Sequence, residues 1–516
     1  MSNANLFTTL RAAFPTDLDA IAIECADQHG PDGLALSYSW RDLERGTAML
    51  ANLFVSLELP AGSRIAAHTD KSVEALMLYL AVLRAGYVYL PLNNAYQAAE
   101  LDYFIKNAEP ALLVCAGKNF GWVSKLAFQA GTAYVFTLND DRSGTLLDRA
   151  ATLSDQHEPA HKEPNELAAI LYTSGTTGRS KGAMLSHGNL RSNALTLKDL
   201  WDWKPGDVLI HALPIFHVHG LFVASHGALL NGSKMIWFAR FDPHAVIARF
   251  AVASVFMGVP TLYVRMLAEA TLTPQACANM RLFISGSAPL LLDTFEDWQT
   301  RSGHTILERY GMSETLMLTS NPCRGLDGER IGGTVGPALP GVDVRVSRDD
   351  GASCATGEIG NIEVRGPNVF SGYWRMPEKT QEEFTADAWF KTGDVGRKDE
   401  NGYFTIVGRA KDLIITGGYN VYPAEIEAYL NEMDGVLESA VVGVPHPDFG
   451  EAVIASVVAR PGATLDGDAL IATLKRQIAG FKVPKQVFVV ADLPRNAMGK
   501  VQKNLLRQQH QQGFKS

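Results

Sequence analysis

The stretch YTSGTTGRSKG, from Tyr172 to Gly182, is the most informative part of this 516-residue sequence. It follows directly on an apolar run, residues 167–172, that predicts a buried strand. Glycine lets a backbone approach a ligand closely, and hydroxyl groups, backbone N–H groups and one lysine can surround phosphate oxygens. The spacing does not match the Walker A pattern. The stretch therefore predicts a phosphate-binding loop after a strand, with a flexible polar turn as the alternative.

The sequence on either side of this loop predicts an α/β fold in two domains. Upstream, expected helices alternate with expected strands, a pattern typical of a wound sheet with parallel strands at its core. The helices are expected at 40–57 and 72–85 and the strands at 64–67, 87–90 and 111–115. We expect a large N-terminal domain, 1–408, of wound sheets and helices that binds ATP and the acid, and a smaller mobile α+β domain, 409–516.

The C-terminal domain is expected to begin where a strand at 403–407 runs into Gly-Arg-Ala-Lys-Asp, residues 408–412. A second strand follows at 413–416. The remaining elements are expected as helices at 423–431 and 468–479 and strands at 439–444 and 452–459.

Composition excludes several classes of function. The formal charge is -9 and Lys and Arg are not clustered, which argues against nucleic-acid binding. The apolar stretches are too short or too interrupted to span a bilayer, so no membrane partner is expected. Five scattered cysteines without a CxxC pair favour neither a disulfide framework nor a zinc ribbon. Together with the absence of an export signal, they predict a cytoplasmic protein.

Seven motifs, of which the loop at 172–182 is the first, resemble those of the acyl-adenylate-forming family of acyl-CoA synthetases, luciferases and peptide-synthetase adenylation domains. The other six are Pro214-Ile215-Phe216-His217, Gly286-Ser287-Ala288-Pro289, Glu308-Arg309-Tyr310-Gly311-Met312-Ser313-Glu314, Lys391-Thr392-Gly393-Asp394, Gly408-Arg409-Ala410-Lys411-Asp412 and Pro494-Arg495-Asn496-Ala497-Met498-Gly499-Lys500. Their order over more than 300 residues leaves little room for chance. The resemblance covers essentially the whole chain and implies that a carboxylate attacks the α-phosphorus of ATP, a reaction that depends on positioning and charge stabilisation.

The resemblance also implies which residues form the site. Those implied to bind ATP are Thr173, Ser174, Gly175, Thr176, Thr177, Gly178, Lys181, Gly286, Ser287, Ala288, Pro289, Glu308, Arg309, Tyr310, Gly311, Met312, Ser313, Asp394, Arg409 and Lys500. Glu314 and Thr176 are implied to hold Mg²⁺, and Lys500, Glu314 and His217 to act in catalysis. Without the surrounding motifs, Asp394 would read as a turn residue and Lys500 as a solvated charge.

A moving C-terminal domain follows from the same resemblance, because the large domain carries most of the nucleotide site and the small one carries Lys500. Lys411 matches the hinge position. Gly417, Gly418 and Tyr419 match a loop that enters the site for thioester formation with coenzyme A. Some relatives are silenced by acylation of the matching lysine, so a lysine acetyltransferase and deacetylase acting on Lys500 are expected partners.

For the acid, the chain resembles bacterial malonyl-CoA synthetases more than fatty-acyl or aromatic-acyl relatives. A dicarboxylate needs a cationic partner far from the phosphates, and the implied contacts are Arg309, Arg265, Ser287 and His217. A charge on a helix surface is the alternative for Arg265. Val218 replaces a threonine that related malonate enzymes tend to carry, which predicts that methylmalonate is also used.

Other interpretations stay open at this point. A short-chain acyl-CoA synthetase of other specificity would show the same ATP motifs, as would a stand-alone adenylation module that loads a carrier protein. A non-catalytic nucleotide-binding protein is disfavoured by Lys500, Glu314 and Asp394. The grouped histidines His211, His217, His219 and His226 lack a cysteine or carboxylate at ligand spacing, so a metal site there is disfavoured.

Overall fold

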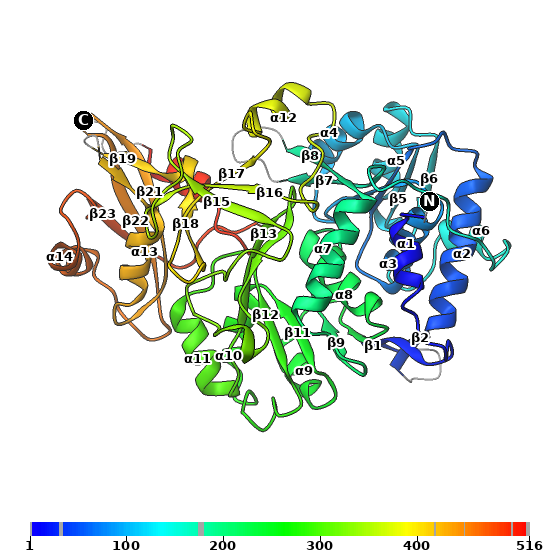
Figure 1. The fold of residues 1–516 in the computed structure, drawn as a ribbon, viewed down its shortest axis with the longest axis horizontal. Coiled ribbons are helices and arrows are strands. Elements are labelled where there is room, and N and C mark those ends of the chain that lie inside the picture. Colours follow the sequence, from blue (N-terminus) through cyan, green and yellow to red (C-terminus); the bar gives the residue numbers. More distant parts are fainter. Residues whose placement is uncertain are drawn as a thin grey trace.

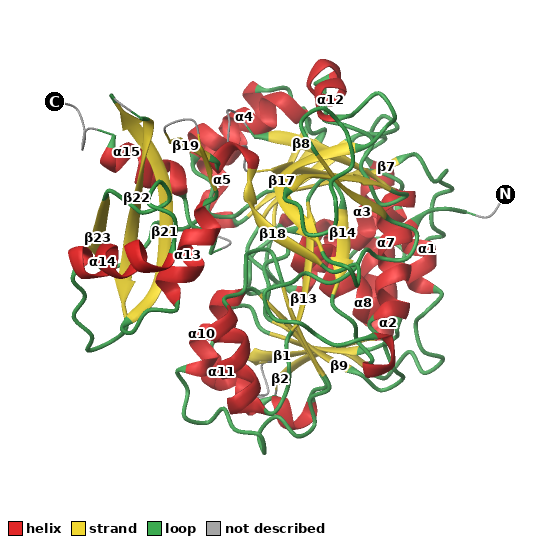
Figure 2. Ribbon diagram, turned by 60° about the vertical axis from the view of Figure 1, so that its left-hand side comes forward, coloured by secondary structure: helices red, strands yellow, loops and turns green. Residues whose placement is uncertain are grey.

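The computed structural model describes residues 3–29, 35–173, 180–416, 419–447, 449–496 and 499–511. The chain forms a large N-terminal lobe and a smaller C-terminal lobe that lies to one side of it, with the two termini at opposite ends (Figure 1). Both lobes contain sheets and helices (Figure 2). The predicted fold class, a large α/β domain with a smaller α+β domain, is confirmed.

A six-stranded sheet contains the apolar strand that precedes the predicted phosphate-binding loop. Its strand order is β6-β5-β3-β4-β7-β8, parallel except for the antiparallel pair β7 and β8. The strands are β3 (Arg64–His68), β4 (Val88–Pro91), β5 (Leu112–Cys115), β6 (Tyr134–Thr137), β7 (Leu167–Thr173) and β8 (Lys181–Ser186). The helices of this region are α2 (Trp40–Ser56), α3 (Val73–Arg84), α4 (Ala98–Ala108), η1 (Gly117–Asn119), α5 (Phe120–Gln129), α6 (Thr145–Ala150) and α7 (His187–Leu200).

The expected helices and strands of this region are confirmed to within about two residues. The side chains of Ser39 and Ser72 cap α2 and α3 by accepting hydrogen bonds from backbone N–H groups. Thr173 at the end of β7 pairs with Lys181 at the start of β8 in an antiparallel register.

An eight-stranded sheet forms the second layer of the large lobe, in the order β14-β13-β12-β11-β9-β10-β1-β2. Its strands are β1 (Ile21–His29), β2 (Ala35–Ser39), β9 (Val208–His211), β10 (Lys234–Trp237), β11 (Val255–Gly258), β12 (Leu282–Ser285), β13 (Leu307–Met312) and β14 (Leu316–Ser320). Accompanying helices are α1 (Leu6–Arg11), η2 (His219–Ala224), α8 (Ser225–Leu230), α9 (Pro243–Ala248), η3 (Phe250–Val252), α10 (Pro260–Leu267), α11 (Leu292–Ser302) and η4 (Gly325–Asp327).

A four-stranded antiparallel sheet, of which only the last strand was predicted, completes the large lobe. It consists of β15 (Asp343–Ser347), β16 (Gly360–Arg365), β17 (Phe390–Lys398) and β18 (Phe404–Arg409), with α12 (Pro377–Glu383) between β16 and β17. The strand expected at 403–407 extends through Gly408 and Arg409, and Arg409 pairs with Asp394 of β17. The expected boundary between residues 408 and 409 therefore falls inside β18, and the division into domains there stays a prediction.

The small lobe is built on a five-stranded sheet of β19 (Ile414–Thr416), β20 (Tyr419–Val421), β21 (Val436–His446), β22 (Gly450–Ala459) and β23 (Gln486–Val490). Its helices are η5 (Ala410–Asp412), α13 (Pro423–Asn431), α14 (Gly467–Gln477) and α15 (Lys503–His510). The expected helix at 423–431 matches α13 residue for residue.

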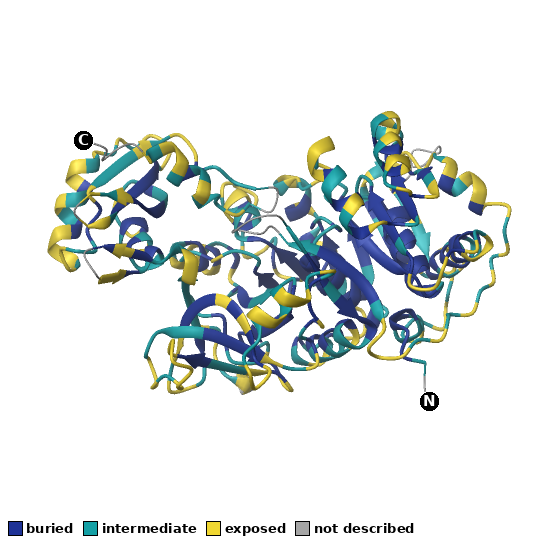
Figure 3. Cartoon of the chain, turned by 90° about the horizontal axis from the view of Figure 1, so that it is seen from above, coloured by how far each residue is buried: buried dark blue, intermediate teal, exposed yellow. Residues whose placement is uncertain are grey.

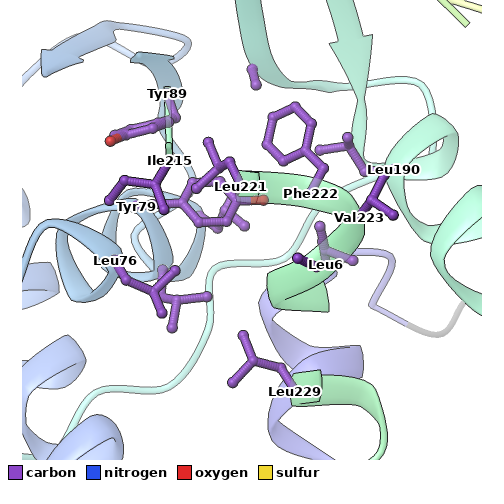
Figure 4. Close-up of a cluster of buried hydrophobic side chains, with 14 of the residues drawn as sticks. Leu6, Leu76, Tyr79, Tyr89, Leu190, Ile215, Leu221, Phe222, Val223 and Leu229 are labelled. Carbon is purple, nitrogen blue, oxygen red and sulfur yellow. The ribbon is translucent and has the colours of Figure 1, made fainter. Parts of the chain in front are cut away.

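Buried side chains follow the central strands of each lobe (Figure 3). In the large lobe, Leu221, Phe222 and Val223 of η2 enter a buried cluster with Tyr79 of α3 (Figure 4). This packing fixes η2, whose first residue, His219, borders the site described below. Within the described ranges, no helix is both long and apolar enough to cross a membrane.

Candidate active site

One part of the site is the carboxylate of Asp394, which contacts one residue of β13 and one of β18. Asp394 of β17 is buried; its Oδ2 accepts a 2.5 Å hydrogen bond from the Tyr310 hydroxyl, and its Oδ1 lies 2.7 Å from Nε of Arg409. Tyr310 ends a regular stretch of β13, where the ladder to β14 contains a bulge. The sheet containing β17 and β18 therefore meets the end of β13 at this carboxylate.

A second part contains Lys181, the first residue of β8, and a buried glutamate, both in contact with Tyr373. Glu314, in the turn between β13 and β14, accepts a 2.9 Å hydrogen bond from the Tyr373 hydroxyl. Burial raises the pKa of Glu314, a shift that a nearby cation would oppose. Lys181 Nζ lies 4.2 Å from the centroid of the Tyr373 ring and 3.2 Å from Oε1 of Glu383 in α12.

A buried arginine forms the third part. Arg309 is 3% exposed, and no described residue hydrogen-bonds its Nε or Nη2. A Cβ on Gly286 would lie 2.5 Å from Arg309 Cζ, so only glycine allows the guanidinium to lie against β12. Burial lowers the pKa of Arg309 to about 9 and raises that of Glu308 to about 8. An anionic ligand would therefore stabilise the charged form of Arg309.

Two histidines and a serine lie close to this arginine. Ser287 Oγ is 3.3 Å from His219 Nδ1, and Ser287 has a φ of 74°, a backbone conformation that non-glycine residues adopt uncommonly. Burial, together with the charges of Lys500 and Arg309, lowers the pKa of His217 to about 3. His217 is therefore neutral at physiological pH. His219 starts the π-helical turn η2, an element often found at functional sites.

The small lobe brings Lys500 into this site. A Cβ on Gly499 would lie 3.2 Å from Oγ1 of Thr261 in α10, so the two lobes approach closely there. Desolvation by surrounding protein lowers the pKa of the Lys500 amine, although the residue stays exposed to solvent. The charged groups that act on this amine include Arg409, Asp394 and Glu314. Opposite lobes thus contribute to one cluster.

The remaining predicted residues fall into three groups. Thr173, Lys181, Ala288, Pro289, Gly311, Met312 and Ser313 lie on the strands and turns just described. Ser174, Gly175, Thr176, Thr177, Gly178, Gly417 and Gly418 lie outside the described residues. Arg265 is exposed on α10, with its guanidinium 4.9 Å from the Phe241 ring centroid, and the structure records no contact between it and Arg309. The predicted role of Arg265 in binding the substrate carboxylate stays a prediction.

The hinge and loop candidates of the small lobe have distinct environments. Lys411 is in η5, and desolvation lowers its pKa to about 8 although its side chain is exposed. Tyr419 is 57% exposed and stacks on Phe481, with ring centroids 4.5 Å apart. Val218 is buried in the main hydrophobic cluster.

Sequence reasoning gave no role to two residues of this cluster, Tyr373 and Glu383. Tyr373 stands between a glycine and a tryptophan, a pattern that is visible in the sequence. Its contacts with Glu314 and Lys181 could not be predicted, because these residues lie 59 and about 190 positions away in the chain. Glu383 stands in a charged helix, Pro377–Glu383, that looks like an ordinary surface helix in the sequence.

Comparison with known proteins gives consistent relatives. The family model described as AMP-binding enzyme matches residues 15–374, and that of the AMP-binding enzyme C-terminal domain matches residues 425–500. The chain is 32% identical over 556 residues to a malonate–CoA ligase of Arabidopsis thaliana, covering 98% of this chain and 89% of the relative. It is 35% identical over 491 residues to a feruloyl-CoA synthase of Amycolatopsis sp, covering 93% and 95%.

Among solved structures, MatB from Rhodopseudomonas palustris is 53% identical and covers 100% of both chains. The TM-score is 0.95 for ATP-bound MatB and 0.83 for apo MatB. Because the sequence identity is the same in both comparisons, the difference reflects the arrangement of the relative's chain. The family resemblance inferred from the seven motifs is confirmed: the chain belongs to the AMP-binding enzyme family.

Proposed function

We propose that this protein is an ATP-dependent, AMP-forming ligase that joins malonate to coenzyme A. The observation that carries the choice of acid is Arg309, a buried guanidinium with two nitrogens that no described residue hydrogen-bonds. A relative named malonate–CoA ligase, similar over 98% of this chain, supports the same choice.

The proposed reaction has two steps. One oxygen of a malonate carboxylate attacks the α-phosphorus of ATP, the bond between the α-phosphorus and the bridging oxygen breaks, and pyrophosphate leaves. The sulfur of coenzyme A then attacks the acyl carbon of malonyl-adenylate, its thiol proton is lost, and AMP leaves with the electron pair of the acyl–oxygen bond. Positioning and charge stabilisation supply most of the rate enhancement in such transfers.

The nucleotide would be held by residues of both lobes. The two oxygens of Asp394 are suited to accept the ribose hydroxyls, with Arg409 and Tyr310 fixing the carboxylate. Lys181 would contact the distal phosphates. Lys500 would offset negative charge at the α-phosphate and the attacking carboxylate, which requires the lobe arrangement seen here.

Glu314 fits a magnesium site. Its buried carboxylate supplies the oxygen ligand that Mg²⁺ prefers, and a bound cation would favour the charged form of a carboxyl group whose pKa burial raises. Mg²⁺ bound there would neutralise part of the triphosphate charge. Thr176 is the second candidate ligand.

Arg309 would bind the distal carboxylate of malonate, with Ser287 and His217 beside it. A charge-assisted hydrogen bond contributes about 1.5–3 kcal/mol, and a monocarboxylic acid would leave the guanidinium buried and unpaired. A site built around such a contact can reject the analogue lacking it by about 10⁴-fold. The feruloyl-CoA synthase relative shows that the family also includes enzymes named for aromatic acids. The choice of acid therefore rests on the residues around Arg309 and not on family membership.

Two further parts of the proposal concern methylmalonate and regulation. Val218 is apolar and buried next to His217 and His219, which supports use of methylmalonate as a second substrate. Lys500 is exposed, which supports access by a lysine acetyltransferase and deacetylase. The five free cysteines support a reducing, cytoplasmic environment.

The experiment that tests this function measures AMP and thioester formation by purified protein with ATP, Mg²⁺ and coenzyme A. Malonate, methylmalonate, succinate, acetate and octanoate are compared in parallel, together with reactions lacking coenzyme A or replacing it with a carrier protein. We expect malonate to dominate and coenzyme A to be required. Turnover dominated by acetate or octanoate would keep the ligase chemistry and reject malonate.

A further inference from the structure

Tyr373 lies between two groups of opposite charge. Its ring centroid is 4.2 Å from Nζ of Lys181, and its hydroxyl donates a 2.9 Å hydrogen bond to Oε1 of Glu314. The tyrosine is only 3% exposed. A single side chain therefore contacts both the lysine that follows the phosphate loop and the buried carboxylate.

The backbone fixes Tyr373 relative to both partners. Gly372 accepts a 3.0 Å hydrogen bond from the Met184 N–H, and Trp374 donates one of 2.8 Å to the carbonyl of Gly182, so residues 372–374 lie alongside β8. The N–H of Phe370 donates a 2.8 Å hydrogen bond to the carbonyl of Glu314. The same short segment is thus tied to the strand of Lys181 and to the turn of Glu314.

The two charged groups have separate partners. Lys181 Nζ lies 3.2 Å from Oε1 of Glu383, and the carboxylate of Glu314 accepts its hydrogen bond from Tyr373. In a buried site the attraction between opposite charges is strong, so a direct contact between Lys181 and Glu314 would neutralise both. The ring of Tyr373 occupies the position from which it can hold them apart.

The geometry points to Tyr373 as a positioning residue that keeps Glu314 and Lys181 separate and orients each toward the nucleotide phosphates. The inference rests on the proposed function, because the roles of Glu314 toward Mg²⁺ and of Lys181 toward phosphate belong to it. The hydroxyl fixes one carboxylate oxygen, and the ring face attracts the ammonium group.

The two functions of the side chain can be separated by substitution. Tyr373→Phe removes the hydrogen bond to Glu314 and keeps the ring beside Lys181. Tyr373→Leu also removes the ring and allows the two charges to meet. Tyr403→Phe is the matched control, because its buried hydroxyl donates a 2.8 Å hydrogen bond to a backbone carbonyl, that of Glu329.

The test is equilibrium binding of ATP, measured by calorimetry with and without Mg²⁺, on full-length variants with matched thermal unfolding midpoints. For Tyr373→Phe we expect the Mg²⁺ concentration for half-maximal ATP binding to rise about tenfold, with binding in the absence of Mg²⁺ unchanged. For Tyr373→Leu we expect weaker ATP binding in both conditions, because Lys181 is then paired with Glu314.

Three outcomes would overturn the inference. Tyr373→Phe could match the wild type and the control, it could lose affinity equally with and without Mg²⁺, or Tyr373→Leu could match Tyr373→Phe. In each case Mg²⁺-dependent ATP binding by the wild type would leave the proposed function standing. A wild type that binds no ATP with Mg²⁺ would reject both.

Discussion

Buried charged residues decide what the site can bind at the scale of single side chains. Arg309 and Glu308 are neighbours on β13, yet Glu308 Oε2 and Arg309 Nε and Nη2 have no hydrogen-bond partner among the described residues, and burial moves the pKa values of both groups toward the neutral forms. A buried charge without a partner lowers the stability of the fold, so such residues are typical of sites where a ligand supplies the opposite charge. The motif at 308–314 predicted that these two residues belong to the site. That both are buried could be seen only in the folded structure.

Asp394 offers a test of the nucleotide site. Asp394→Asn keeps the shape of the side chain but removes the charge that pairs with Arg409. We expect ATP affinity, measured by calorimetry, to fall about tenfold or more, because hydrogen bonds to charged groups contribute about 1.5–3 kcal/mol. Asp343→Asn, which alters an exposed pair with Arg365, is the control and is expected to bind normally. Equal affinities would remove Asp394 from the site.

His226 offers a test by pH. Burial lowers its pKa to about 3, whereas the unfolded chain has an ordinary histidine pKa near 6.5. Between these values the unfolded state binds more protons, so the free energy of unfolding falls as pH drops below about 6.5. We expect His226→Gln to reduce this loss by about 2 kcal/mol between pH 8 and pH 5, measured by urea unfolding. An unchanged pH slope would show that His226 binds protons equally in the folded and unfolded states.

Among the helices and strands, those with strong local sequence signals were predicted closely. Helices α2, α3 and α13 have local signals, namely capping serines or an N-terminal proline, so the sequence predicted them closely. Of the sheet of β15 to β18, the sequence predicted only the strand at 403–407, because the antiparallel strands β15, β16 and β17 are separated by turns and by α12. Asp394, Arg409 and Tyr310 were predicted individually, but their contacts depend on this sheet.

The bulged hairpin of β13 and β14 depends on a glycine. A Cβ on Gly311 would lie 2.0 Å from the carbonyl oxygen of Leu316, on the backbone of the facing strand. We expect Gly311→Ala to lower the free energy of unfolding by about 2 kcal/mol or more and to displace Tyr310 and Glu314. Thermal unfolding and ATP binding measure the two effects.

The matched control for this substitution is Gly121→Ala. Gly121 lies in α5, and nothing within 4 Å would meet its Cβ. Alanine there is expected to raise stability by up to about 1 kcal/mol, because it is the better helix former. Equal effects of the two substitutions would contradict the steric account of Gly311.

For the whole molecule, the arrangement of the two lobes places Lys500 in the site. The lobes meet at Gly499 and Thr261 and at an ion pair in which Arg460 Nη2 lies 3.0 Å from Asp293 Oδ2. This arrangement resembles ATP-bound MatB more than apo MatB. Under the proposed function, this arrangement would place Lys500 for adenylate formation.

The ion pair between the lobes provides a test of that assignment. Asp293→Lys is expected to slow malonate-dependent exchange of pyrophosphate into ATP up to about fivefold, because an exposed ion pair contributes at most about 1 kcal/mol. Thioester formation from supplied malonyl-adenylate is expected to be unaffected. Adding Arg460→Glu restores the pair with reversed charges and is expected to recover the exchange rate. No recovery would mean that the pair does not stabilise this arrangement.

The most direct test of whether Arg309 selects a dicarboxylic acid compares malonate with 3-methylbutyrate, in which an isopropyl group replaces the distal carboxylate. The measurement is the ratio of kcat/KM values for the two acids in the wild type, Arg309→Met and Arg265→Met. The account predicts a ratio of about 10⁴ in the wild type that falls at least about 100-fold in Arg309→Met. The Arg265→Met ratio shows whether the exposed arginine shares the role. An equal ratio in the wild type and Arg309→Met would contradict the proposal that Arg309 selects a dicarboxylic acid.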